Sequence, residues 1–546
     1  MRFPAAALLL IACNQPQSIE MVDREYSQLM RGLAAAERDN TKNFKDSEAQ
    51  ARKTRLEQER IAFFTNEVNT EVIEGAVDSS DPFTAARGAA YQLDALIHRS
   101  WTDEEKEQEQ ELLGTLQRLR QNEVVWASAD GEVEVALNRS WSSVARDAAG
   151  LDSEQADELL TAWVDARTAW MGDELTELVR LRNEVARREG FETYWELAVV
   201  HRGLTVERIE EMDRALTEMV APMNQRRSAE LASLAEGLGL ENNFYNTPAI
   251  SDASEQWPTN LEMNAAYDAD LVETRMFTAM REMGISLDGL QIYTGPTRYT
   301  RPGAYGYAIS PPEDFAIVMS RDSRWSAWAY SALAHEMGLA FWWKSLPERA
   351  ATSPVMWEPP SPWFEGIGQL FERLAMSEDF ARNYIEGFPG EIAVTLDAHH
   401  KAEAAEEITF YLGASQMERY IYEHPGQWSA VATEAASLEA QLNGFTWESP
   451  TSSEGVPYSG LLQSGLMLHY PGYIQNYLFA SATEQTLFKV ITEAVGEPVG
   501  NHMVGPWLRE HLVGPVSRGQ SFPAVLAELA EEESPIAALA EWFAAE

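Results

Sequence analysis

The stretch from Arg324 to Lys344, RWSAWAYSALAHEMGLAFWWK, contains the residues with the clearest chemical potential. His335 is followed directly by Glu336. In one common helical motif, a second histidine four residues after the first binds the same metal ion, and the glutamate acts as general base. Here that position is Leu339, which has no lone pair to donate. The sequence therefore raises the question whether this chain still binds a metal.

A catalytic zinc ion needs three protein ligands and one open position for water. Glu365, in the segment WFEGIGQ, has the residue type and position of a third ligand on the next predicted helix. Because Leu339 replaces the second ligand, only His335 and Glu365 remain as metal ligands. We therefore expect no bound cofactor, unless another side chain completes a zinc site.

Three other histidines could supply a substitute ligand. They are the pair His399-His400 and, further along the chain, His469. The simpler interpretation is that these are surface or core histidines without a metal. Without a metal-activated water, Glu336 contributes little as a general base.

Several further segments occur in the order found in one peptidase family. These are Phe64 to Thr70, Leu181 to Phe191, Met417 to Pro425 and Pro471 to Tyr477. Together with HEMG at His335 and EGIG at Glu365, they make the chain resemble the angiotensin-converting-enzyme (peptidyl-dipeptidase A, M2) family of zinc peptidases. Several motifs in one order are stronger evidence for a fold than for an activity.

The resemblance implies roles for individual residues. His335 and Glu365 match metal ligands, and Glu336 matches the general base. Tyr477 matches the tyrosine that stabilises the oxyanion, while Tyr473 and His469 lie near substrate-contacting positions.

The register of these C-terminal matches is open. Tyr473 and Tyr477 are four residues apart, whereas the family's two tyrosines are three apart. An alignment on Tyr473 would place Asn476 at the oxyanion position.

Two further departures accompany Leu339. Gln369 replaces the family's aspartate, a carboxylate of the kind that orients a ligand imidazole. No lysine occurs between Lys401 and Lys489, so the lysine that binds the substrate's terminal carboxylate is also absent. An arginine could replace it, but the sequence does not indicate which one. The β-like stretch from Gly306 to Met319 corresponds to the edge of the substrate cleft, where an extended peptide can add as a strand.

The first residues are typical of a bacterial lipoprotein signal. Arg2 precedes an apolar run, Pro4 to Ala12, which ends at Cys13, the only cysteine. This run is too short to span a bilayer. We expect residues 1–12 to be removed, Cys13 to be lipidated and residues 13–18 to form a tether. The location would be the cell envelope, at the outer membrane or facing the periplasm, with the lipid as the only membrane contact. The alternative is an apolar tail with an incidental cysteine.

The 546 residues are 45% hydrophobic and carry a formal net charge of -44. Nucleic acid is excluded as a partner, because its phosphates would be repelled. Helical periodicity dominates, for example over Leu151 to Gly190 and Thr205 to Leu238, and two short β-like segments precede the His335 helix. We expect a mainly α, two-lobed fold with a deep central cleft, a small sheet beside that helix, and a single domain over residues 19–546.

Three functions remain open at this point. The first is a non-catalytic pseudopeptidase that binds peptides in an inherited cleft. The second is an active zinc metallopeptidase with a substitute ligand and Glu336 as base. The third is a structural envelope protein whose cleft is filled by Trp342, Trp357 or Trp363.

Overall fold

The structure is a computed structural model. It describes residues 18–121, 124–128, 133–139, 141–148, 150–243, 246, 250, 265–321, 326–444, 449–531 and 536–544. Helices account for most of this part of the chain, and the predicted mainly α fold with a small sheet is confirmed. None of the helices described combines the length and the apolar character needed to cross a bilayer.

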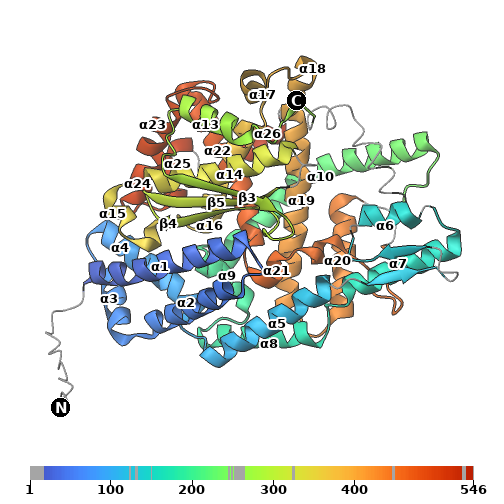
Figure 1. Cartoon of the computed structure of the whole chain (residues 1–546), viewed down its shortest axis with the longest axis horizontal. Helices are drawn as coiled ribbons and strands as arrows, with labels where there is room; N and C mark the ends of the chain where they lie inside the picture. The colour runs from blue at the N-terminus through green and yellow to red at the C-terminus, as the bar shows by residue number, and fades with distance from the viewer. Residues whose placement is uncertain are drawn as a thin grey trace, which may run out of the picture.

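The N-terminal half is a succession of helices (Figure 1), interrupted along the chain by one short hairpin between α5 and α6. Its helices are α1 (Ile19–Lys42), α2 (Ser47–Thr65), α3 (Glu67–Val77), α4 (Pro82–His98), α5 (Asp103–Gln121), α6 (Trp141–Ala148), α7 (Ser153–Thr168), α8 (Asp173–Arg188), α9 (Tyr194–His201), α10 (Val206–Leu238) and α13 (Val272–Glu282). Strands β1 (Val125–Ala127) and β2 (Glu134–Ala136) pair antiparallel. The sequence did not predict this hairpin, and the helix expected from Leu151 to Gly190 is divided into α7 and α8.

The larger sheet has the order β3-β5-β4 and lies beside the central helix α14 (Ser326–Ser345). β3 (Leu290–Pro296) runs parallel to β5 (Asp314–Arg321), and β4 (Ala304–Ser310) runs antiparallel to it. β5 is buried along most of its length because both neighbours and α14 cover it. β4 therefore forms one edge of the sheet, next to α14 and α1.

The C-terminal half packs helices against α14. Its α-helices are α15 (Glu348–Ala351), α16 (Ser361–Ala375), α17 (Glu378–Tyr384), α18 (Gly390–Ala393), α19 (Leu396–Glu423), α20 (Trp428–Asn443), α21 (Leu466–His469), α22 (Ile474–Val495), α23 (Val504–Leu508), α24 (Gly514–Ser517), α25 (Phe522–Ala530) and α26 (Ile536–Ala544). A continuous hydrophobic core joins residues from Ile61 to Leu539. Within it, α16 lies between α14 and α22, so three helices distant in sequence meet at one place.

Small residues allow these helices to approach closely. A Cβ on Gly338 of α14 would lie 2.7 Å from the ring of Phe371 on α16. A Cβ on Gly366 would lie 2.5 Å from Thr483 on α22. The tight packing of α14, α16 and α22 fixes the relative positions of any side chains that they present to a common space.

Candidate functional site: a polar cavity at the His335 helix

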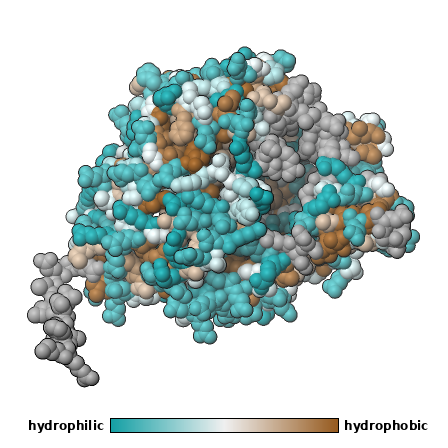
Figure 2. Space-filling view, viewed as in Figure 1, coloured by the Kyte–Doolittle hydropathy of each residue, from teal (hydrophilic) through white to brown (hydrophobic). Residues whose placement is uncertain are grey.

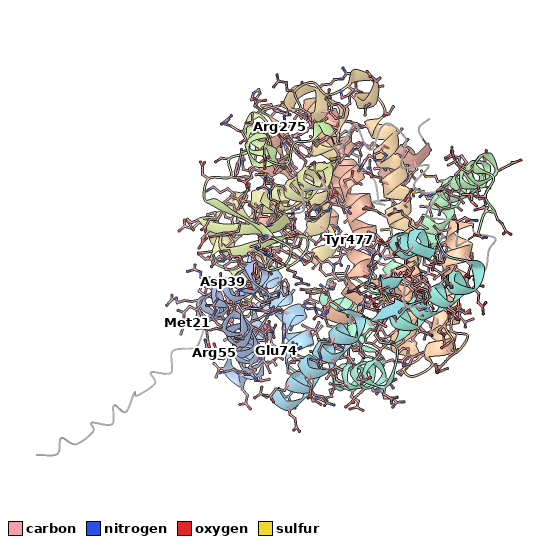
Figure 3. All side chains as sticks on the ribbon, turned by 45° about the vertical axis from the view of Figure 1, so that its right-hand side comes forward. Met21, Asp39, Arg55, Glu74, Arg275 and Tyr477 are labelled. Atoms are coloured by element: carbon pink, nitrogen blue, oxygen red, sulfur yellow. The ribbon has the colours of Figure 1, made fainter. Side chains whose placement is uncertain are left out.

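A cavity of about 370 Å³ lies where α14, α16, β4, α1 and the start of α22 meet. His335, Glu336 and Leu339 from α14 line it, together with Glu365 from α16. Tyr473 and Tyr477 line its opposite wall. Tyr477 lies near the middle of the molecule in Figure 3. The fold thus brings together six of the residues singled out by the sequence, although they span more than 140 positions.

The imidazole of His335 is held between two carboxylates. Its Nε2 lies 3.3 Å from Oε2 of Glu365, and its Nδ1 lies 3.4 Å from Oε2 of Glu372. Burial alone would lower the pKa of His335, but the hydrogen bonds to these two carboxylates raise it well above its usual value. His335 is therefore a cationic imidazolium with both nitrogens occupied.

Glu372 was not identified from the sequence. Gln369 stands where the resemblance places an aspartate, but another carboxylate lies beside the imidazole. Glu372, one helical turn further along α16, supplies the carboxylate, and Ser331 donates a hydrogen bond to it. The signal was present in the i, i+3 spacing of Gln369 and Glu372, which places both near one face of a helix.

Gly368 makes room for the imidazole on α16. A Cβ at this position would lie 2.4 Å from Nε2 of His335. Any larger residue would displace the ring from Glu365. The glycine one turn before Glu372 is therefore part of what positions His335.

Leu339 occupies the position where the motif requires a second histidine. Its side chain is 7% exposed and forms part of the cavity wall. The zinc ion implied by the sequence motif does not fit the residues present. The second of its three ligand positions is the aliphatic Leu339, and the described residues contain no group of three or more His, Cys, Asp or Glu that could hold a metal ion.

The histidines considered as substitutes lie elsewhere. His400 faces Glu484 at 3.5 Å and His399 faces Glu403 at 3.1 Å, both away from the cavity wall. His469 ends α21, and its neighbour Tyr470 lines the cavity instead. Burial and nearby arginines lower the pKa of His469 to about 4.

Glu336 is buried with one oxygen unsatisfied. The residue is 8% exposed, and its Oε2 has no hydrogen-bond partner in the described structure. Burial raises the pKa of Glu336 to about 7. The positive charge of His335 lowers this pKa, whereas the negative charges of Glu365 and Glu358 raise it. A second glutamate, Glu358, also lines the cavity and is exposed to solvent.

At the start of α22, both Tyr473 and Tyr477 line the cavity. Tyr473 donates a hydrogen bond from its hydroxyl to Glu365, and the rings of Tyr473 and Tyr477 lie 5.8 Å apart. A spacing of four residues places both on one helical face. Asn476 is fully buried and does not line the cavity. Burial and the charge of Glu365 raise the pKa of both tyrosines well above the usual value, so both remain neutral donors.

The three tryptophans considered as cleft-filling residues do not fill this cavity. Trp342 and Trp363 are buried in the core, and Trp357 borders an adjoining cavity of about 530 Å³. The two cavities share wall residues, including Glu358 and Tyr473.

Each of the two cavities also has an arginine in its wall that the sequence could not place: Arg301 in the cavity at His335 and Arg202 in the adjoining one. Arg301 lies 3.2 Å from the hydroxyl of Tyr470, and Arg202 stacks over the ring of Tyr473 at 4.7 Å.

Comparison with known proteins supports the fold. No family model matches the chain, and no curated protein matches its sequence. A crystal structure described provisionally as oligoendopeptidase F is similar to this chain, with a TM-score of 0.65 at 14% sequence identity. The match covers 96% of this chain and 90% of the chain in that structure. The chain therefore has an oligoendopeptidase-like, helical peptidase fold. At this identity the likeness concerns the fold alone.

Proposed function

We propose that this protein is a lipid-anchored pseudopeptidase related to the peptidyl-dipeptidase A family, which binds peptides without hydrolysing them. The proposal depends on one observation. Leu339 lines the cavity where a nitrogen ligand is required, which leaves His335 and Glu365 as the two remaining ligands of the motif. Two protein ligands do not hold a catalytic zinc ion, and the base Glu336 has no activated water to deprotonate.

Peptide binding is supported by the edge of the sheet. β4 pairs with β5 on one side only, and Ala304 to Tyr307 line the cavity. An extended peptide can add to such an edge through main-chain hydrogen bonds. The cavity volume is within the range of small-ligand sites.

Metal analysis with a single substitution tests this proposal. Leu339→His restores the two-histidine spacing, and we expect about one zinc ion per chain in this variant but well under ~0.1 in the wild type. Leu339→Gln is the matched control, because it adds polarity without a good zinc ligand.

The converse result would identify an active enzyme. Wild-type protein with near-stoichiometric zinc, chelator-sensitive cleavage of short peptides and loss of cleavage in Glu336→Gln would refute the proposal.

Anchoring through Cys13 is a separate part of the proposal, and this residue lies outside the described part of the chain. The first described helix begins at Ile19, so the folded part would lie directly at the membrane surface. Cys13→Ser should release the protein from the membrane fraction and abolish incorporation of labelled fatty acid. Unchanged membrane association in this variant would contradict lipidation.

A further inference from the structure

The carboxylates of the cavity differ in whether they have a cationic partner. Glu365 faces the imidazolium of His335, and Glu37 faces Lys53 at 3.1 Å. Within the described residues, no lysine, arginine or histidine nitrogen lies within 4 Å of Glu336 or Glu358. Arg301, the remaining cation of the cavity wall, bonds to Tyr470. The cavity therefore contains two carboxylates without a neutralising partner.

The unbonded oxygen of Glu336 lies at a narrow point of the cavity wall. Its Oε2 is buried beside Gly306, where an added Cβ would lie 2.7 Å from this oxygen and 2.8 Å from the ring of Trp343. The glycine leaves a small space between the carboxylate and the indole. A buried carboxylate oxygen without a donor costs free energy, and a ligand that donates to it recovers that cost.

The walls around this space suit a compact cation. Tyr305, Tyr473 and Tyr477 line the same cavity as the indole of Trp343. Aromatic faces attract ammonium groups, and more strongly where water is excluded. The net charge of -44 favours the approach of cationic molecules. The face shown in Figure 2 is mainly hydrophilic.

We infer that the cavity binds a primary ammonium group of its ligand between Glu336 and Glu358, against the ring of Trp343. The ligand thus supplies the positive charge that a metal ion supplies in an active peptidase. An ammonium has three donors, so it can donate to more than one carboxylate. This inference rests on the proposed function, because the peptide bound along β4 would present either its amino terminus or a lysine side chain.

Calorimetry on the full chain with four probes tests the inference. The probes are tetra-alanine with a free amino terminus, N-acetyl tetra-alanine, an N-acetyl tetrapeptide with one lysine, and 1,4-diaminobutane. We expect the free-amine form to bind at least about 10-fold more tightly than the acetylated form without lysine, because charge-assisted hydrogen bonds are the strong ones. The lysine peptide distinguishes a side-chain amine from an amino terminus.

Three isosteric substitutions locate the effect. Glu336→Gln and Glu358→Gln should each reduce the preference for the free amine by about 10-fold. Glu418→Gln is the matched control, since Glu418 is also buried but lies outside this cavity. A preference that survives both cavity substitutions, or that Glu418→Gln abolishes equally, would overturn the inference.

The probes separate the inference from the function on which it rests. Equal binding of the free and acetylated peptides would refute ammonium recognition while peptide binding stands. Binding of the diamine alone, with dependence on Glu336, would support the ammonium site and refute peptide binding. Absence of binding by all four probes would refute both.

Discussion

Two buried glutamates, Glu336 and Glu418, show how differently this fold treats the same chemical group. Both are less than 9% exposed, and burial raises the pKa of each to about 7. Glu418 accepts hydrogen bonds from the backbone amide of Gly472 at 3.0 Å and from Gln475 at 3.2 Å. Glu336 has an unsatisfied oxygen that borders a cavity.

The region beside Glu418 contains a buried hydrogen-bond network centred on Arg182. Arg182 donates to Glu109 at 2.7 Å, to Tyr422 at 3.0 Å and to the carbonyl of Leu468 at 2.8 Å. These contacts tie α8 to α5, α19 and α21. The two carboxylates therefore differ in their surroundings: Glu418 accepts hydrogen bonds from neighbouring groups of the fold, whereas Oε2 of Glu336 accepts none and borders a cavity.

The largest effect should follow from breaking the satisfied network. Arg182→Met leaves Glu109 and the carbonyl of Leu468 buried with fewer donors, and we expect the free energy of unfolding to fall by about 3–5 kcal/mol. Arg188 lies on the same helix, α8, as Arg182, and its exposed side chain forms an ion pair with Glu105 of α5. Arg188→Met should cost less than ~1 kcal/mol. Denaturant titration measures both, and equal losses would remove the distinction.

A smaller effect is expected where the cavity wall is disturbed. Gly368→Ala places a methyl group against Nε2 of His335 and should cost about 1–3 kcal/mol. Gly237→Ala in α10 meets no heavy atom within 4 Å, so it should leave stability unchanged or raise it by up to ~1 kcal/mol. If thermal unfolding shows the same change in both variants, Gly368 does not position the imidazole.

The next effect depends on pH. The pKa of Glu418 is about 7 in the folded protein and near 4.5 when the chain is unfolded, so the folded state holds this proton more tightly. The contribution of protonated Glu418 to the free energy of unfolding is complete below about pH 4.5 and is lost as the pH rises to about 7. Glu418→Gln stays neutral, and its stability relative to wild type should therefore rise across this window. A difference independent of pH in urea titrations would contradict the raised pKa.

The smallest change in stability is expected at Glu336. Glu336→Gln removes a carboxylate that forms no ion pair within 4 Å among the described residues and whose Oε2 has no hydrogen-bond partner, so the free energy of unfolding should change by less than ~1 kcal/mol. A loss comparable to that of Arg182→Met would show that Glu336 is structural, and the comparison between the two regions would fail.

Much of the fold could be predicted because the signals are local. The helical periodicity of Thr205 to Leu238 corresponds to α10. The small sheet was predicted too, but its parallel pairing of β3 with β5 was not. Strand pairing depends on contacts between distant segments, which periodicity does not encode.

The sequence by itself determined that His335, Glu336 and Leu339 share one helix, and that the second ligand position is aliphatic. It did so because spacing along a helix fixes which side chains are neighbours. Only the tertiary structure decided that Glu372 holds the imidazole, that Tyr473 bonds to Glu365, and that Glu336 has an oxygen without a partner. These contacts arise from the close packing of α14, α16 and α22, where small residues set the distances between side chains that lie far apart in the chain.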